Sequence, residues 1–238
     1  MTLEDYTKAV IQTLTELYNK DMLPKSHQDF LDKLKNDYKF VPNIIYDIGS
    51  SLLHWTRHAK RVWPESNIYL FDAFAPAYFL YEGYTYNLSL LSDEDGKELK
   101  FYQNDFHPGG CSYYREIGSK YSNLIYPEDK FIIKKSRSLD SLVREHNYPI
   151  PDLIKIDIQG AELDLLKGAS NILSNIKCLI IEMQHTQYNE GAPLINVTKK
   201  YLEDNGWVCI AEKFSLNTSG DNIADADYCF INIKKLLQ

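Results

Sequence analysis

Four polar residues that could carry out chemistry lie close together near the middle of the chain: Lys155, Asp157, Gln159 and Glu162. They interrupt or follow an apolar run over residues 153–158, which predicts a buried parallel strand. Gly160 then turns the chain, and residues 161–167 are rich in strong helix formers. In a strand–turn–helix unit of this kind, ligands bind outside the carboxyl end of the strand. We therefore expect these polar side chains at the edge of a sheet that binds a ligand.

A second acidic side chain is predicted at the same edge. Residues 177–182 form another apolar run that ends in Glu182, and His185 follows shortly after. Neighbouring parallel strands end together, so Asp157 and Glu182, with His185, make a candidate site for a divalent metal ion. The alternative is that Lys155 forms an ion pair with Asp157 while Glu182 caps a loop. The sequence leaves both interpretations open.

A third acidic position follows a strand earlier in the chain. Residues 43–49 and 67–74 predict two strands joined by a helix over residues 52–63, and Asp72 lies at the end of the second strand. A carboxylate at this point can accept hydrogen bonds from both ribose hydroxyls of a nucleoside-containing cofactor. The single glycine of the first turn, Gly49, argues against a dinucleotide site, because a pyrophosphate needs several glycines there.

Two stretches of the sequence resemble a known family. KIDIQGAELDLLKGA (residues 155–169) resembles the K-x-D-x-E-G-x-E-x-x-x-L-x-G-A signature of the FkbM-type S-adenosylmethionine-dependent methyltransferases, and RSLDSL (residues 137–142) resembles the stretch that precedes it. The resemblance covers roughly residues 44–187. It implies an α/β, Rossmann-like class I methyltransferase fold: a central seven-stranded, mostly parallel sheet flanked by helices, with a terminal antiparallel strand. Gln159 and Leu53 depart from the family pattern, which has Glu and Gly at these positions.

The resemblance also implies S-adenosylmethionine as the cofactor. The positions that match the family's motifs give its candidate ligands: Asp47, Gly49, Ser50, Ser51, Asp72, Ser92 and Asp93. Two neighbouring pairs among these residues have a simpler interpretation. Ser50 and Ser51 could cap the following helix, and turns favour residues such as Ser92 and Asp93.

The reaction that we expect is O-methyl transfer to a hydroxyl of a sugar or glycan. Over residues 103–130 the periodicity disappears while aromatic and hydrogen-bonding residues accumulate, which suits a carbohydrate acceptor. The candidate substrate-binding residues are His107, Tyr113 and Gln159. A hydroxyl needs a base or a metal to become a good nucleophile. Asp157 and His185 are the candidate bases, with Lys155 as electrostatic support, and Mg²⁺ or Mn²⁺ is the candidate metal.

The composition suits one α/β domain with an N-terminal addition. The chain has 238 residues, 44% hydrophobic and 25% charged, with a net charge of −7. We expect a helical extension over residues 1–42, with helices over 2–20 and 26–38, and a methyltransferase domain over 43–238. The acidic balance argues against a nucleic-acid partner. Without a membrane span or a signal segment, we expect a cytoplasmic protein. The two helices could cover the substrate cleft or form a homo-oligomer contact.

Further strands are predicted over residues 87–92, 98–102 and 131–135, and an antiparallel pair over 207–213 and 227–233. Two other functions stay open at this point. One is an NAD-dependent oxidoreductase on a similar sheet. The other is a non-catalytic, methyltransferase-like binding module, which the two departures from the family pattern would permit.

Overall fold

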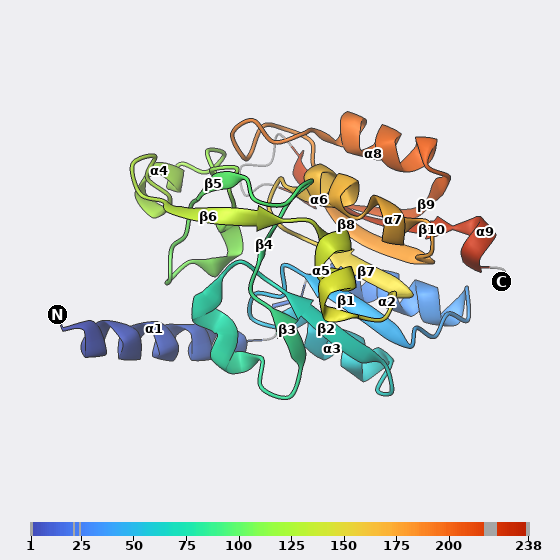
Figure 1. Ribbon diagram of the computed structural model, residues 1–238, viewed down its shortest axis with the longest axis horizontal. Helices are drawn as coiled ribbons and strands as arrows, with labels where there is room; N and C mark the ends of the chain where they lie inside the picture. Colours follow the sequence, from blue (N-terminus) through green and yellow to red (C-terminus); the bar gives the residue numbers. More distant parts are fainter. Residues whose placement is uncertain (1, 21, 24, 217–222, 237–238) are drawn as a thin grey trace.

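The computed structural model describes residues 2–20, 22–23, 25–216 and 223–236. Its centre is a seven-stranded sheet in the order β3-β2-β1-β7-β8-β10-β9 (Figure 1). The strands are β1 (Ile44–Ile48), β2 (Asn67–Phe71), β3 (Thr85–Asn87), β7 (Leu153–Ile156), β8 (Cys178–Gln184), β9 (Trp207–Leu216) and β10 (Ile223–Asn232). From β3 to β8 all neighbours pair in parallel, and β10 pairs antiparallel with both β8 and β9. This is the predicted class I methyltransferase sheet with its antiparallel ending.

Helices cover both faces of the sheet (Figure 1). One face packs against α1 (Leu3–Tyr18), α2 (Lys25–Asn36) and α3 (His54–Val62). The other packs against α5 (Leu139–His146), α6 (Glu162–Gly168), α7 (Ser170–Leu173) and α8 (Ile195–Asp204). A short helix, α9 (Ile233–Leu236), follows β10. Both faces of the central strands are apolar because each meets a helical layer. In β7, for example, Leu153 belongs to the first core and Ile154 to the second.

The N-terminal helices share a core with the sheet. Leu14 of α1 and Leu34 of α2 are fully buried in the same apolar cluster as Ile45 of β1. The side chains of Thr2 and Asp5 form the capping box that begins α1. The second helix begins one residue before the predicted Ser26. The division of the chain after residue 42 stays a prediction.

The predicted strand over residues 87–92 is wrong, because it is two strands in different sheets. Pairing with β2 ends at Asn87. The chain then turns, and β4 (Leu90–Leu91) joins a three-stranded sheet of order β4-β6-β5, with β5 (Glu98–Phe101) and β6 (Ile132–Arg137). Leu90 and Leu91 are both buried. A strand with one buried face would bury only every second residue, so this pattern fits a chain passing between two sheets.

The stretch from residue 103 to 130 is mostly irregular, as predicted. It contains only a 3-10 turn, η2 (Pro108–Gly110), and one turn of helix, α4 (Ser122–Ile125). A second 3-10 segment that the sequence did not predict, η1 (Ala75–Leu80), follows β2. Within the described ranges, no helix has the length and apolar content needed to cross a membrane.

Candidate active site

A cavity lies at the carboxyl edge of the main sheet, and it contains most of the predicted site residues. Its walls come from the carboxyl ends of β1, β2, β7 and β8 and the segments that follow the first three, from α2, α3 and β10, and from the irregular stretch after β5. The predicted residues that line it are Gly49, Ser50, Ser51, Asp72, Tyr113, Lys155, Asp157, Gln159 and Glu182. The sheet order places Asp72 and Gly49 in one half, and Glu182 in the other, with β7 between them.

Five predicted site residues do not line this cavity: Asp47, Ser92, Asp93, His107 and His185. Ser92 is buried under Gly168, and Asp93 forms an ion pair with Lys97. His107 is exposed, and only its neighbours Pro108 and Gly109 reach the cavity.

His185 lies just beyond β8, and its Nε2 is 2.8 Å from the hydroxyl of Tyr228. Tyr228 belongs to the core between the sheet and α5–α8, whereas its neighbour Asp227 lines the cavity. Because successive strand residues point to opposite faces, this contact holds His185 away from the site. Its position does not support the predicted role as base or metal ligand.

The turn after β1 is held by contacts that only glycine permits. Gly49 has φ +76°, and its N–H donates to the carbonyl of Phe71 at 2.9 Å. A Cβ at Gly49 would lie 1.8 Å from the carbonyl oxygen of Asp157. The turn is therefore packed directly against the end of β7, backbone to backbone.

Hydrogen bonds to Asp72 connect the turns that follow β1 and β2. Its carboxylate accepts hydrogen bonds from the N–H groups of Ser51 at 2.6 Å and Phe74 at 2.7 Å. Burial raises the pKa of Asp72 above its ordinary value, and these two hydrogen bonds oppose that shift. The side chain is only partly buried and lines the cavity. Asp72 therefore fixes the backbone on the cofactor side of the cavity and also presents its carboxylate to the cavity.

The two serines do not cap α3, so that alternative is wrong. Ser50 donates its hydroxyl to the carbonyl of Asp47 at 2.7 Å, and the N-cap of α3 is Leu53, without a side-chain hydrogen bond. Leu53 has φ +60°, the left-handed conformation that a glycine would favour. This costs about 1–2 kcal/mol. Leu53 is also 2% exposed, and burying a leucine contributes about 1.5–3 kcal/mol, which offsets the strain.

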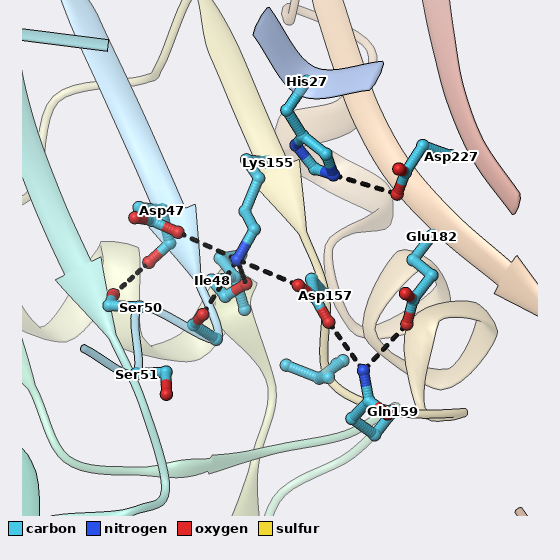
Figure 2. Close-up of polar contacts among 12 residues, drawn as sticks. His27, Asp47, Ile48, Ser50, Ser51, Lys155, Asp157, Gln159, Glu182 and Asp227 are labelled. Carbon is cyan, nitrogen blue, oxygen red and sulfur yellow. Dashed lines mark hydrogen bonds and ion pairs between the residues drawn. The ribbon is translucent and has the colours of Figure 1, made fainter. Parts of the chain in front are cut away.

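Lys155 is a buried cation between two carboxylates (Figure 2). Its Nζ lies 3.3 Å from Oδ1 of Asp47 and 3.6 Å from Oδ2 of Asp157, and it donates to the carbonyl of Gly49 at 2.8 Å. Burial alone would lower the pKa of Lys155, but the two carboxylates outweigh burial and raise it. Lys155 therefore stays charged. Asp47 is fully buried behind the cavity wall and also accepts a hydrogen bond from Thr56.

Gln159 bridges the two carboxylates that were predicted to hold a metal ion (Figure 2). Its Nε2 donates to Oδ1 of Asp157 and to Oε2 of Glu182, both at 2.8 Å. Burial and the charge of Asp157 raise the pKa of Glu182. Burial also acts to raise the pKa of Asp157, but Lys155 and Gln159 outweigh it and lower that pKa.

The donor set does not fit the predicted Mg²⁺ or Mn²⁺. Oxygen-ligated cations of this kind need several oxygen ligands around one point, whereas the Gln159 amide presents N–H groups between the two carboxylates. Among the residues that the structure describes, no group of three or more His, Cys, Asp and Glu side chains is placed to hold a metal ion. The ion pair of Lys155 with Asp157, the alternative to the metal site, is present.

Comparison with known proteins decides the family. The model of the methyltransferase FkbM domain matches residues 47–209, more than half of the chain. The chain belongs to the FkbM methyltransferase family. This confirms the resemblance found in the sequence.

Two similar proteins match this chain over short segments. A protein of Jannaschia sp. (strain CCS1), provisionally named as a methyltransferase, is 35% identical over 85 residues, 36% of this chain and 28% of that protein. The hexuronic acid methyltransferase AglP of Haloferax volcanii is 39% identical over 49 residues, 21% of this chain and 20% of that protein. The chain thus aligns with a quarter or so of these relatives.

Solved structures resemble this FkbM protein only distantly. The O-methyltransferase from Bacillus cereus in complex with SAH gives a TM-score of 0.49 at 10% identity, covering 97% of this chain and 92% of that chain. The N-methyltransferase NodS from Bradyrhizobium japonicum WM9 gives 0.49 at 9% identity, covering 94% and 98%. At these values the likenesses carry no argument about chemistry, and the fold assignment rests on the strand order.

Replacing Gln159 by glutamate should create the cation site that this FkbM domain lacks. The variant would gather three carboxylates where the amide now lies, and a divalent cation would relieve their repulsion. We expect Gln159→Glu to bind Mn²⁺ at least about tenfold more tightly than the wild type in a calorimetric titration. Gln12→Glu, which adds the same charge on the exposed side of α1, is the control. Equal Mn²⁺ affinity of wild type and Gln159→Glu would contradict this account of the site.

Glu162 stabilises the turn between β7 and α6 by hydrogen bonds to the backbone. Its Oε1 accepts hydrogen bonds from the N–H groups of Ile158 and Gly160, both at 3.1 Å. Burial raises the pKa of Glu162 from 4.5 to about 7; the charge of Asp157 adds to this effect and the two hydrogen bonds oppose it.

The protein should therefore become less stable as the pH rises, because Glu162 then loses its proton. Because the pKa of Glu162 is higher in the folded state, its contribution is complete below pH 4.5 and is lost as the pH rises through about 7. The loss amounts to about 3 kcal/mol. Glu162→Gln keeps the accepting oxygen, so the variant should lack this part of the pH dependence. Urea unfolding of both proteins at about pH 5 and about pH 8 measures it. If the free energy of unfolding changes with pH equally in the wild type and in Glu162→Gln, Glu162 is not the group responsible.

His27 of α2 and Asp227 of β10 line the cavity but were not singled out from the sequence. Both lie outside the segment that matches the FkbM domain. His27 is spaced four residues from Leu31 and three from Phe30, which are both buried, so helical periodicity places it on the buried face of α2. Asp227 and Asp225 alternate with alanines in β10, a period of two that places both aspartates on one face of the strand. This pattern predicts a solvent-facing aspartate, whereas Asp227 is buried.

Proposed function

We propose that this protein transfers a methyl group from S-adenosylmethionine to a hydroxyl of a sugar or glycan. The observation that carries the proposal is one continuous cavity at the carboxyl edge of the sheet. The glycine turn and Asp72 lie in one half, and a set of hydrogen-bonding carboxylates lies in the other. Membership of the FkbM methyltransferase family supports methyl transfer as the reaction.

The residues of the first half fit the donor. Gly49 and Ser51 line this half of the cavity, and Asp72 offers its carboxylate to ribose hydroxyls. S-adenosylmethionine supplies a methyl group that its sulfonium charge makes electrophilic. Asp157, which follows β7 between the two halves and is held ionised by Lys155, gives the cavity a negative charge that favours a cationic ligand.

The second half fits a hydroxyl-bearing acceptor. Gln159 and Glu182 offer polar groups there, and the rings of Tyr113 and Phe74 add apolar surface to the same cavity. Such a mixture can orient a sugar and exclude water, and orientation of the reacting atoms can supply much of the rate. The similarity to AglP of Haloferax volcanii, a hexuronic acid methyltransferase, supports a sugar as acceptor. The carboxylates of this cavity favour a neutral sugar over a sugar acid, because like charges repel.

Two measurements test the proposal. Calorimetric titration with S-adenosylmethionine, S-adenosylhomocysteine and NAD⁺ should give binding of the first two only. Methyl transfer from radiolabelled S-adenosylmethionine to p-nitrophenyl glucoside, galactoside, mannoside and glucuronide should favour the neutral glycosides. Binding of NAD⁺ alone would favour the oxidoreductase that the sequence left open. Donor binding without transfer to any glycoside would overturn the sugar acceptor.

A further inference from the structure

The N-terminal extension and the last long strand together build a histidine–aspartate pair in the wall of the cavity. His27 lies on α2 and Asp227 on β10, and they are separated by 200 positions in the chain. Both side chains line the cavity and are almost fully buried, with exposed fractions of 4% and 5%. We refer to His27 and Asp227 as the dyad.

The dyad is held in one orientation. His27 Nε2 lies 2.9 Å from Oδ1 of Asp227. The other carboxylate oxygen of Asp227 accepts a hydrogen bond from the hydroxyl of Ser26 at 2.5 Å. Because a carboxylate only accepts hydrogen bonds, Nε2 must carry the proton of this contact. In the neutral ring, Nδ1 then has a free lone pair.

That lone pair has no partner in the described part of the chain. Nδ1 of His27 is buried and makes no hydrogen bond to any described residue. A buried polar atom without a partner is costly, and buried polar groups in native proteins are generally paired. A ligand that donates a hydrogen bond into the cavity would satisfy it.

The dyad lies on the side of the cavity away from the donor-binding turns. Asp227 is directly opposite Glu182 in the pairing of β10 with β8, and Asp157 follows β7, the next strand. Figure 2 shows the ring of His27 on the same side of Lys155 as Asp157 and Glu182, with Asp47 on the other side. Asp72 follows β2, on the far side of β1. The dyad therefore belongs to the acceptor half, and Figure 2 shows Nδ1 on the edge of the His27 ring that faces away from Asp227.

We propose that His27 is the general base of the reaction and that Asp227 orients it. This inference rests on the proposed function. As the acceptor oxygen bonds to the methyl carbon, the carbon–sulfur bond breaks and its electron pair stays on sulfur. The hydroxyl proton passes to Nδ1 of His27, and Asp227 stabilises the resulting imidazolium. His27 then releases the proton to solvent. Asp157 is less suited to the task, because Lys155 and Gln159 already bind its carboxylate.

Variants of both residues test the dyad with the p-nitrophenyl glycoside that the wild type methylates fastest. His27→Ala and His27→Gln should lower kcat at least about 100-fold, the usual contribution of a general base. Their affinity for S-adenosylhomocysteine should stay within about twofold of the wild type, since the donor-binding turns are unchanged. Added imidazole should restore part of the activity of His27→Ala but not of His27→Gln, in which the side chain fills the space. Asp227→Asn should also lower kcat, because its amide can donate to Nε2 and so place the ring proton on Nδ1.

His146→Ala is the matched control, because this exposed histidine on α5 does not line the cavity. Its kcat should equal that of the wild type. If both His27 variants bind S-adenosylhomocysteine and keep kcat within about threefold of the wild type, the dyad is overturned while the proposed function stands. Loss of kcat without rescue by imidazole in His27→Ala would also count against a base. A wild type that methylates no glycoside overturns the proposed function and, with it, the dyad.

Discussion

Replacing Gly49 by alanine is expected to weaken binding of S-adenosylhomocysteine about 100-fold. The added Cβ would lie 1.8 Å from the carbonyl oxygen of Asp157, a backbone atom that cannot rotate away. The turn after β1 and the end of β7 would have to separate, and this would distort the cavity on both sides. Strain of about 3 kcal/mol, ordinary for a clash of this kind, corresponds to a loss of about 100-fold in affinity.

The control separates the clash from the effect of backbone conformation alone. Gly96 also has a positive φ, +84°, but a Cβ there meets nothing within 4 Å. Gly96→Ala should therefore lower the free energy of unfolding by only about 1 kcal/mol and leave affinity for S-adenosylhomocysteine unchanged. Calorimetric titration and urea unfolding measure the two effects. A Gly49→Ala protein that binds S-adenosylhomocysteine as the wild type does would show that the turn is not packed as described.

Replacing Lys155 by methionine is expected to give the largest loss of stability. Lys155 is 4% exposed, and it compensates the charge of Asp47, which is fully buried. Removing one partner of a buried ion pair typically costs about 3–5 kcal/mol, because the remaining charge is left uncompensated. Urea unfolding should show this decrease in the free energy of unfolding.

Two further variants identify the cause. Lys155→Met/Asp47→Asn removes both charges while keeping an oxygen that can accept from Thr56, so it should regain much of the lost stability. Lys177→Met removes a cation of the same type from Asp152 in a pair whose lysine is 38% exposed, and it should cost at most about 1 kcal/mol. Equal losses for Lys177→Met and Lys155→Met would refute the role of burial.

The fold could be predicted because its signals are local. Apolar runs bounded by glycine and polar residues mark β1, β7 and β8, and these strands were found close to their observed ends. The split between β3 and β4 could not be found this way, because pairing partners distant in the chain decide which sheet a short apolar run joins. The oligomeric state and the cellular compartment stay predictions.

The site was predicted where it depends on strand ends and missed where it depends on contacts between distant segments. Gly49, Asp72 and Asp157 follow strands of the parallel sheet and line the cavity as a group. The bridging position of Gln159 could not be foreseen, because it follows from a left-handed backbone at that residue, φ +55°. The spacing within α2 places His27 on the buried face of that helix, but it does not reveal that this face meets the cavity.

The contact between α2 and β10 has a consequence for the order in which a newly made chain matures. The hydroxyl of Ser26 and the carboxylate of Asp227 are 201 positions apart, so this wall of the cavity cannot form until β10 has been synthesised and has docked beside β8. Domains fold as their segments leave the ribosome, and contacts between distant segments form last. Nascent chains would thus lack this wall of the cavity during translation, and its formation would report that β10 is in place.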